Sequence, residues 1–115
     1  MKELKMQSYT TVSEIYPSRF LKSSDIGDSD LVLTIESVVP EDLSSTDHIE
    51  LKPVLYSKEI TKGFVLNKTN VNTIAHLFGE RIEQWIGKKI TLYTTEVSFQ
   101  GNQMKGIRVR GQPPQ

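Results

Sequence analysis

Apolar and polar residues alternate in several stretches of the chain, and this two-residue period predicts strands that bury one face. The clearest stretch is 88–97, in which Ile90 and Leu92 alternate with polar residues. Pro53 lies within another stretch and has no backbone N–H, so we expect its nitrogen to face a sheet edge or a bulge. The predicted strands are residues 31–39, 49–58, 62–68, 88–97 and 104–110.

A longer period separates the third and fourth predicted strands. Between Val71 and Phe78 the apolar residues recur every three or four positions, which predicts a helix with one apolar stripe over 69–78. Gly79 suits the end of this helix, because glycine adopts the left-handed conformation in which many helices stop. A further short turn contains Trp85, the single tryptophan. We expect its side chain to pack in the core rather than to stack on a nucleic-acid base.

The order of these elements indicates the fold. Five strands with one helix between the third and the fourth is the order of the OB-fold, a small barrel that often holds single-stranded nucleic acid. We therefore predict a mainly β domain with one or two short helices, folded as a five-stranded OB-like barrel over residues 18–110. We expect residues 1–17 to form a flexible N-terminal arm and residues 111–115 a disordered tail, because chain ends with little to bury are commonly unordered.

Composition narrows the class of protein. A chain of 115 residues with 37% apolar and 24% charged side chains fits one ordinary globular domain. No apolar run approaches the roughly 20 residues of a membrane helix, and the first eight residues lack the apolar centre of a secretory signal. The absence of cysteine excludes disulfides, thiol catalysis and thiolate metal sites. We expect a cytoplasmic protein with no membrane partner.

The net charge is zero, but the charges are unevenly distributed. Residues 1–50 carry four basic and ten acidic side chains, a balance of −6. Residues 51–115 carry ten basic and four acidic side chains, a balance of +6. This asymmetry suggests an anionic partner for the basic half; the alternative is that the two halves neutralise each other in the folded domain.

Single strands are bound by cations along the phosphates and by aromatic faces under the bases. The expected phosphate-binding residues are Lys52, Lys62, Lys68, Lys88, Lys89, Lys105, Arg108 and Arg110, and the expected stacking residues are Tyr56, Tyr93 and Phe99. Arg108 and Arg110 carry the strongest argument, because strand alternation places both on one face about 7 Å apart, near the spacing of successive phosphates. The alternative is a solvated face whose cations maintain solubility, with Tyr93 as a cross-strand packing partner.

Catalysis has little support in the sequence. The two histidines are His48, in a polar stretch, and His76, on the predicted helix, and no catalytic or nucleotide-binding motif accompanies them. Residues 23–30 contain three aspartates, but their spacing does not match a calcium-binding loop, so we predict a polar turn there. We expect a protein that is not an enzyme, with no catalytic residue, cofactor or metal site.

Six segments of the chain carry a resemblance: Ser18 to Ile26, Pro53 to Tyr56, Lys62 to Asn70, Trp85 to Tyr93, Phe99 to Gly101 and Ile107 to Arg110. Together they resemble a family of small, mostly uncharacterised phage and prophage proteins encoded among replication and recombination genes. The resemblance covers residues 18–110. Residues 1–15 and 41–48 have no counterpart in the family pattern. The resemblance implies an OB-like barrel that binds single-stranded DNA.

These observations predict a phage or prophage accessory protein that binds single-stranded DNA with little sequence preference during replication or recombination, in the cytoplasm of the host cell. One alternative is a non-enzymatic protein-interaction module that engages a phage or host replication or recombination protein. Another is a small component of a larger assembly.

Overall fold

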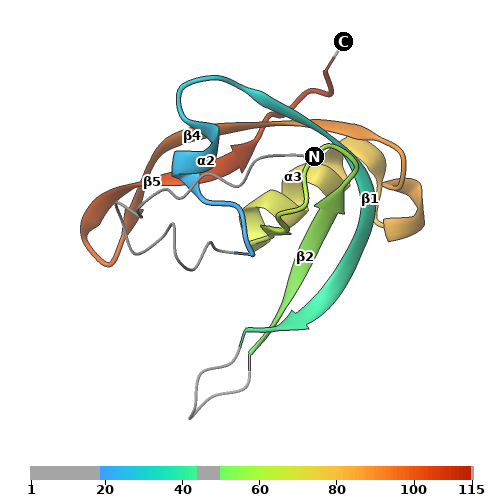
Figure 1. Cartoon of the computed structure of the whole chain (residues 1–115), viewed down its shortest axis with the longest axis horizontal. Coiled ribbons are helices and arrows are strands. Elements are labelled where there is room, and N and C mark those ends of the chain that lie inside the picture. Colours follow the sequence, from blue (N-terminus) through green and yellow to red (C-terminus); the bar gives the residue numbers. More distant parts are fainter. Residues whose placement is uncertain (1–18, 44–49, 115) are drawn as a thin grey trace, which may run out of the picture.

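The strands of the computed structural model form one antiparallel sheet in the order β3-β2-β1-β4-β5 (Figure 1). The strands are β1 (Leu31–Asp42), β2 (Leu51–Ser57), β3 (Phe64–Val65), β4 (Lys89–Phe99) and β5 (Asn102–Val109), and the helices are α2 (Ser23–Ile26), α3 (Lys68–Phe78) and the 3-10 helix η1 (Ile82–Gln84). The structure describes residues 19–43 and 50–114. The predicted arm at 1–17, His48 and Gln115 of the predicted tail therefore lie outside the described residues.

Strand β1 belongs to both halves of the sheet. Its first residues pair with β4, beginning with Leu31 opposite Leu92, and its later residues pair with β2 as far as Asp42 opposite Leu51. The register shifts between Ile35 and Ser37, which marks a β-bulge, and bulges bend strands. The bend allows one strand to serve two hairpins that diverge, as Figure 1 shows for β1–β2 and β4–β5.

The sheet is not closed into a barrel in the described part of the chain, since β3 and β5 stand at its two ends. The outer edge of β3 is extended by the segment before α2, where Phe20 bridges Gly63 in parallel and the Leu21 N–H donates to the Gly63 carbonyl at 2.8 Å. The outer edge of β5 contacts α3. The prediction is confirmed in its coarser form, a mainly β domain with five strands and short helices.

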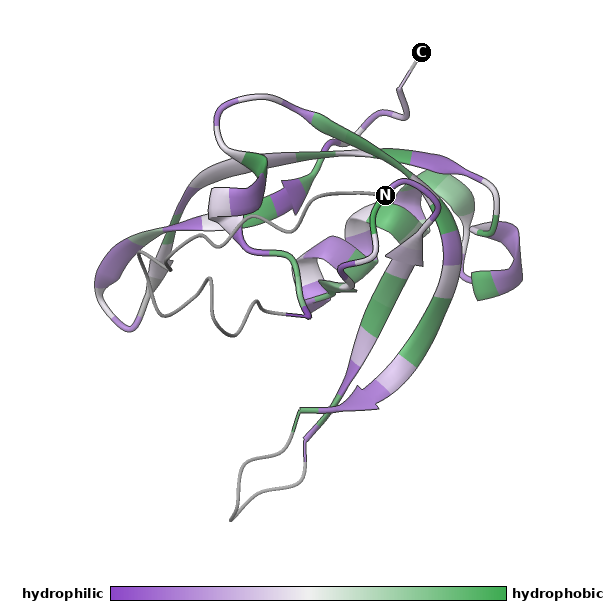
Figure 2. Ribbon diagram, in the orientation of Figure 1, coloured by the Kyte–Doolittle hydropathy of each residue, from purple (hydrophilic) through white to green (hydrophobic). Residues whose placement is uncertain are grey.

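The core lies where the apolar faces of the strands meet α3 and the turn after it. Leu33, Leu55, Ile74 and Ile90 are among the buried residues, as the alternation and the helical stripe predict. Trp85 is 1% exposed and its indole Nε1 donates to the Gly79 carbonyl at 2.8 Å, which makes it a packing residue. Figure 2 shows apolar and polar residues alternating along β1 and β2.

Two local predictions differ from the structure. The third strand, predicted over 62–68, has only two residues, because the Asn67 carboxamide accepts from the Asn70 N–H at 2.8 Å and starts α3 at once. The predicted polar turn at 23–30 begins with the single helical turn α2, whose Asp25 carboxylate accepts from the Lys22 N–H at 2.8 Å. Local capping decides both boundaries.

Pro53 pairs with Pro40 of β1 on one side and lies just beyond the last β2–β3 pair on the other side. Its carbonyl accepts from the Leu66 N–H at 2.9 Å, just beyond the last residue of β3. Backbone groups of one strand residue point the same way in an antiparallel ladder, so the Pro53 nitrogen also faces this side. The missing N–H therefore falls at the end of the β2–β3 ladder, where no strand bond is lost.

Candidate nucleic-acid interface

A groove of about 370 Å³ occupies the gap between the two end strands of the sheet. One wall is formed by β3 and the first turn of α3, and the other by residues 104–108 of β5. Leu21 and Ser23, next to the bridge on the β3 edge, also line it. We call this feature the β3–β5 groove. It exists because the sheet stays open at this point.

The β3–β5 groove combines cations with apolar surface. Lys105 and Arg108 line it, and no carboxylate of residues 19–43 or 50–114 does. Apolar surface comes from residues such as Phe64 and Met104, the latter 50% exposed. Glu96 lies opposite Lys105 in the β4–β5 ladder but is not part of the lining. The groove therefore suits a ligand with both anionic and apolar parts.

Arg108 is held at the rim of this groove by β5. It is half-buried and lies directly opposite Tyr93 in the ladder, and its guanidinium donates to the Ile107 carbonyl at 3.2 Å. None of the described carboxylates forms an ion pair with it. Its positive charge is therefore available to a bound anion.

Arg110 lies on the same face but is already engaged. Its guanidinium donates two hydrogen bonds to the Asp30 carboxylate, at 2.8 and 2.9 Å, and sits 4.2 Å above the centre of the Tyr93 ring. The hydrogen bond from Arg110 lowers the pKa of the Asp30 carboxyl below its ordinary value. Asp30, an acidic residue of the N-terminal half, therefore neutralises Arg110, a cation of the C-terminal half. The Arg110 guanidinium in turn covers the Tyr93 ring.

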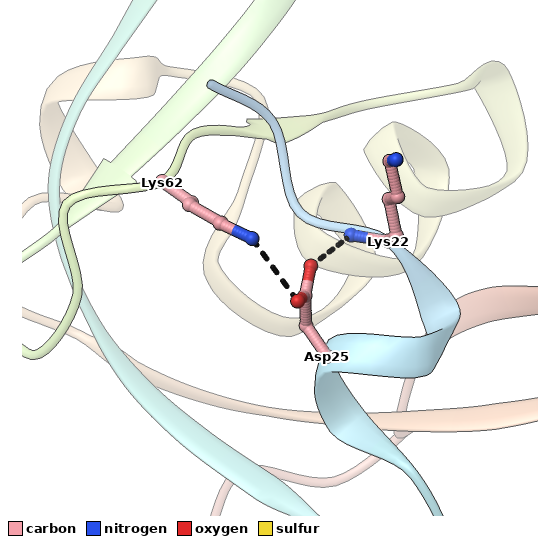
Figure 3. A network of polar contacts seen from close by, with 3 residues as sticks. All are labelled: Lys22, Asp25 and Lys62. Atoms are coloured by element: carbon pink, nitrogen blue, oxygen red, sulfur yellow. Dashed lines mark hydrogen bonds and ion pairs between the residues drawn. The ribbon is translucent and has the colours of Figure 1, made fainter. Parts of the chain in front are cut away.

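Two of the predicted lysines are also paired with carboxylates. Lys62 contacts Asp25 at 3.0 Å, and Figure 3 shows the Asp25 carboxylate between this ammonium group and the Lys22 N–H. The Lys22 hydrogen bond, assisted by Lys62, lowers the pKa of the Asp25 carboxyl. Lys52 contacts Glu50 at 2.9 Å. Neither Lys62 nor Lys52 lines the β3–β5 groove.

Tyr56 contacts β1 and does not line the β3–β5 groove. Its hydroxyl donates to the Glu41 carboxylate, and this hydrogen bond raises the pKa of the phenol above its ordinary value. The hollow beside it is also lined by Glu36 and Glu59. Carboxylates disfavour phosphate, so this hollow is a poor place for a nucleic-acid strand.

The remaining predicted residues do not converge on one place. Lys68 begins α3, and Lys88 and Lys89 lie at the start of β4; all three are exposed, and none lines the groove. Phe99 ends β4, and its side chain lies outside the described part of the structure. From the predicted set, the structure thus places only Lys105 and Arg108 at the groove. Tyr93 and Arg110 line a separate hollow next to Arg108.

The sequence interpretation missed Asn70 as a groove residue. In the structure Asn70 is buried, lines the groove, and donates through Nδ2 to the Ile107 carbonyl at 3.0 Å. One signal was present: Asn70 lies four residues before Ile74, on the same side of α3 as the apolar stripe. A polar residue at an apolar position of a helix points to a specific buried contact.

The described residues contain no group of three or more His, Cys, Asp or Glu side chains placed to hold a metal ion. In the same part of the chain, no helix combines the length and the apolar character needed to cross a membrane. No family model, curated protein or solved structure matches this chain.

Proposed function

We propose that this protein binds single-stranded DNA in the β3–β5 groove, with little sequence preference. The observation that carries the proposal is a groove lined by Lys105 and Arg108, by apolar side chains and by no carboxylate from the described part of the chain. Cations neutralise the phosphates, while apolar surface and π faces receive the bases irrespective of sequence. Tyr93 lies opposite Arg108 in the ladder, but it lines a separate hollow with Arg110 and is not part of the groove lining.

We also propose that the sheet is an OB-like barrel left open between its end strands. The strand order β3-β2-β1-β4-β5 and the position of α3 between β3 and β4 support this proposal. The bulge that lets β1 take part in both hairpins supports it too. In this arrangement the opening between β3 and β5 is the binding site.

The resemblance to phage and prophage proteins supplies the proposed setting, which is DNA replication or recombination in the host cytoplasm. Single strands occur as intermediates in both processes. A binder with little sequence preference suits them, because the exposed sequence differs at each event.

Fluorescence anisotropy with labelled oligo-dT tests the binding proposal. We expect affinity to fall between about 50 mM and 200 mM salt, with a log–log slope of about −0.7 for each phosphate neutralised. The double variant Lys105→Gln with Arg108→Gln removes both groove cations, so we expect weaker binding and a slope shallower by about 1.4. The matched control, Lys58→Gln with Arg81→Gln, removes two cations outside the groove lining and should bind like the wild type.

Two results would contradict the proposal. One is an affinity for oligo-dT that does not respond to salt. The other is a control variant that loses as much affinity as the groove variant, because a loss of that kind reflects total charge and not the groove.

A second candidate function is a protein-interaction module. The part of the outer β5 edge near Lys105 favours it, because no described strand pairs with this edge and the contact from Asn70 occupies only the Ile107 carbonyl. The Arg110 N–H donates to the Thr91 carbonyl, so alternation turns the backbone groups of Lys105 and Ile107 away from β4. Such an edge can pair with an extended peptide. Co-purification of a partner, with no salt-dependent affinity for oligo-dT, would favour this function over DNA binding.

A further inference from the structure

Asn70 has one polar atom without a partner at the wall of the β3–β5 groove. The residue is 1% exposed, and its Oδ1 atom is buried and accepts no hydrogen bond from any described residue. Buried polar side-chain atoms usually have a partner, because an unpaired one loses its hydrogen bonds to water. An unpaired acceptor beside a groove therefore points to a group that is bound there in the working complex.

The orientation of the Asn70 carboxamide is fixed by its other contact. Nδ2 donates to the Ile107 carbonyl at 3.0 Å, which ties α3 to the edge of β5. A flipped amide would bring two carbonyl oxygens together, so the observed orientation is the favourable one. The free end of the side chain is thus an acceptor, and it selects ligands that carry an N–H or O–H donor.

A second buried polar atom, Ser57 Oγ, also lacks a partner among the described residues, but its surroundings differ. Its hollow is shared with Glu36 and Glu59, whose carboxylates disfavour a nucleic-acid strand. The Asn70 acceptor lies beside Lys105 and Arg108 instead.

We propose that Asn70 is a specificity-determining residue that accepts a hydrogen bond from a nucleotide held in the β3–β5 groove. This inference rests on the proposed function, since it assigns one contact within that site. Phosphates and internal deoxyriboses carry no donor, so the donor is a base N–H or, in RNA, a ribose 2′-hydroxyl. Binding that is otherwise tolerant of sequence then requires a donor at this one position.

Modified oligonucleotides test the inference on the unaltered protein. The anisotropy titration compares oligo-dT with oligo-N3-methyl-dT, which lacks the thymine N–H, and oligo-U with oligo-N3-methyl-U. If a base donates, methylation weakens binding of both DNA and RNA by about 5- to 100-fold, the range expected for leaving a buried acceptor unpaired. If the ribose donates, oligo-U binds more tightly than oligo-dT by a similar factor and methylation has no effect on oligo-U.

The variant Asn70→Leu provides the second arm. It removes the acceptor at similar volume, so the discrimination seen with the wild type should disappear. Asn72→Leu is the matched control, because Asn72 lies on the same helix, is exposed and is not part of the groove lining. If circular dichroism shows that Asn70→Leu does not fold, the comparison of the four oligonucleotides on the wild-type protein still tests whether a donor is required in the groove.

The outcomes separate the inference from the function on which it rests. Salt-dependent binding with equal affinity for all four oligonucleotides would overturn the role of Asn70 and leave DNA binding standing. An absence of salt-dependent binding to any of them would overturn both proposals.

Discussion

At the scale of single residues, several positions in this protein are set by contacts between segments that are distant in sequence. Gly63 is one of them: it bridges the segment before α2 and faces the side chains of β2. A Cβ atom at this position would lie 2.5 Å from Val54 Cγ1 and 3.0 Å from Tyr56 Cε1. Val54 is buried and its branched side chain cannot move aside easily, so only glycine fits.

We therefore expect Gly63→Ala to lower the free energy of unfolding by about 1–3 kcal/mol, the usual effect of overpacking. Urea denaturation followed by tryptophan fluorescence measures the change, since Trp85 is buried. Gly111→Ala is the control, because a Cβ there meets nothing within 4 Å. Equal stability of Gly63→Ala and the wild type would show that the β2 side chains relax freely.

The contact between Arg110 and Asp30 leads to a second prediction at this scale. Arg110 lies outside the groove lining, two residues beyond Arg108 along the chain. If a bound DNA strand continues past Arg108, Asp30 competes with its phosphate for Arg110. Asp30→Asn should then raise the affinity for oligo-dT about two- to fivefold, the range for releasing an exposed ion pair, and steepen the salt slope by about 0.7.

Asp28→Asn is the matched control for this variant, because it makes the same change of charge in the same turn without touching Arg110. An identical gain in both variants would mean that only net charge matters and that Arg110 takes no part in binding.

At the scale of elements, the connection between β2 and β3 is tied to β1 by Glu59. Its carboxylate accepts from the Thr34 N–H at 2.7 Å and from the Thr34 hydroxyl at 2.6 Å. The side-chain bond from Thr34, followed by the backbone bond, lowers the pKa of the Glu59 carboxyl below its ordinary value of 4.5. The ionised form is thus the one that fastens this connection next to the bulge in β1.

This lowered pKa gives the direction of a pH effect. A carboxyl whose pKa is lower in the folded state stabilises the fold above its ordinary value of 4.5, and the stabilisation is lost as pH falls through the lowered value. We expect Glu59→Gln to have a lower Tm than the wild type at neutral pH, and the two Tm values to converge as the pH falls through the lowered pKa of Glu59, below 4.5. Thermal melts over this range measure it, and a constant Tm difference would contradict the assignment.

The elements also show what the sequence could predict and what it could not. Residues 88–97 alternate strictly and residues 31–39 are rich in β-branched side chains, and the structure confirms both stretches as strands, β4 and β1. The third strand is shorter than predicted because the Asn67 cap starts α3 within the stretch that the apolar run predicted as strand. The engagement of Arg110 by Asp30 joins residues 80 positions apart, and the partner of Asn70 depends on how α3 meets β5, so no local pattern contains either contact.

At the scale of the whole molecule, the outer edge of β5 pairs with no strand of the described residues. The N–H groups of Gly106 and Arg108 face β4, whereas those of Lys105 and Ile107 face away and donate to no described residue. The β4–β5 hairpin is therefore protected on one side only.

Amide hydrogen exchange followed by NMR can detect this difference. We expect the Lys105 and Ile107 amides to exchange much faster than those of Gly106 and Arg108, because only the second pair is bonded within the ladder. Equal protection of all four amides would show that the edge is covered in solution, by closure of the barrel or by another chain.

Addition of a tightly bound oligonucleotide should raise the Tm of the domain by mass action.

The pairing of β1 with both β2 and β4 has a consequence for co-translational folding of this protein. Its partner β2 follows it closely, but Leu31 pairs with Leu92, so the other flank of β1 waits for a segment made much later. Until β4 has emerged from the exit tunnel, the nascent chain has an incomplete sheet whose apolar face is exposed to solvent. Chaperone capture is then to be expected during that interval of translation and to end once synthesis has passed β5.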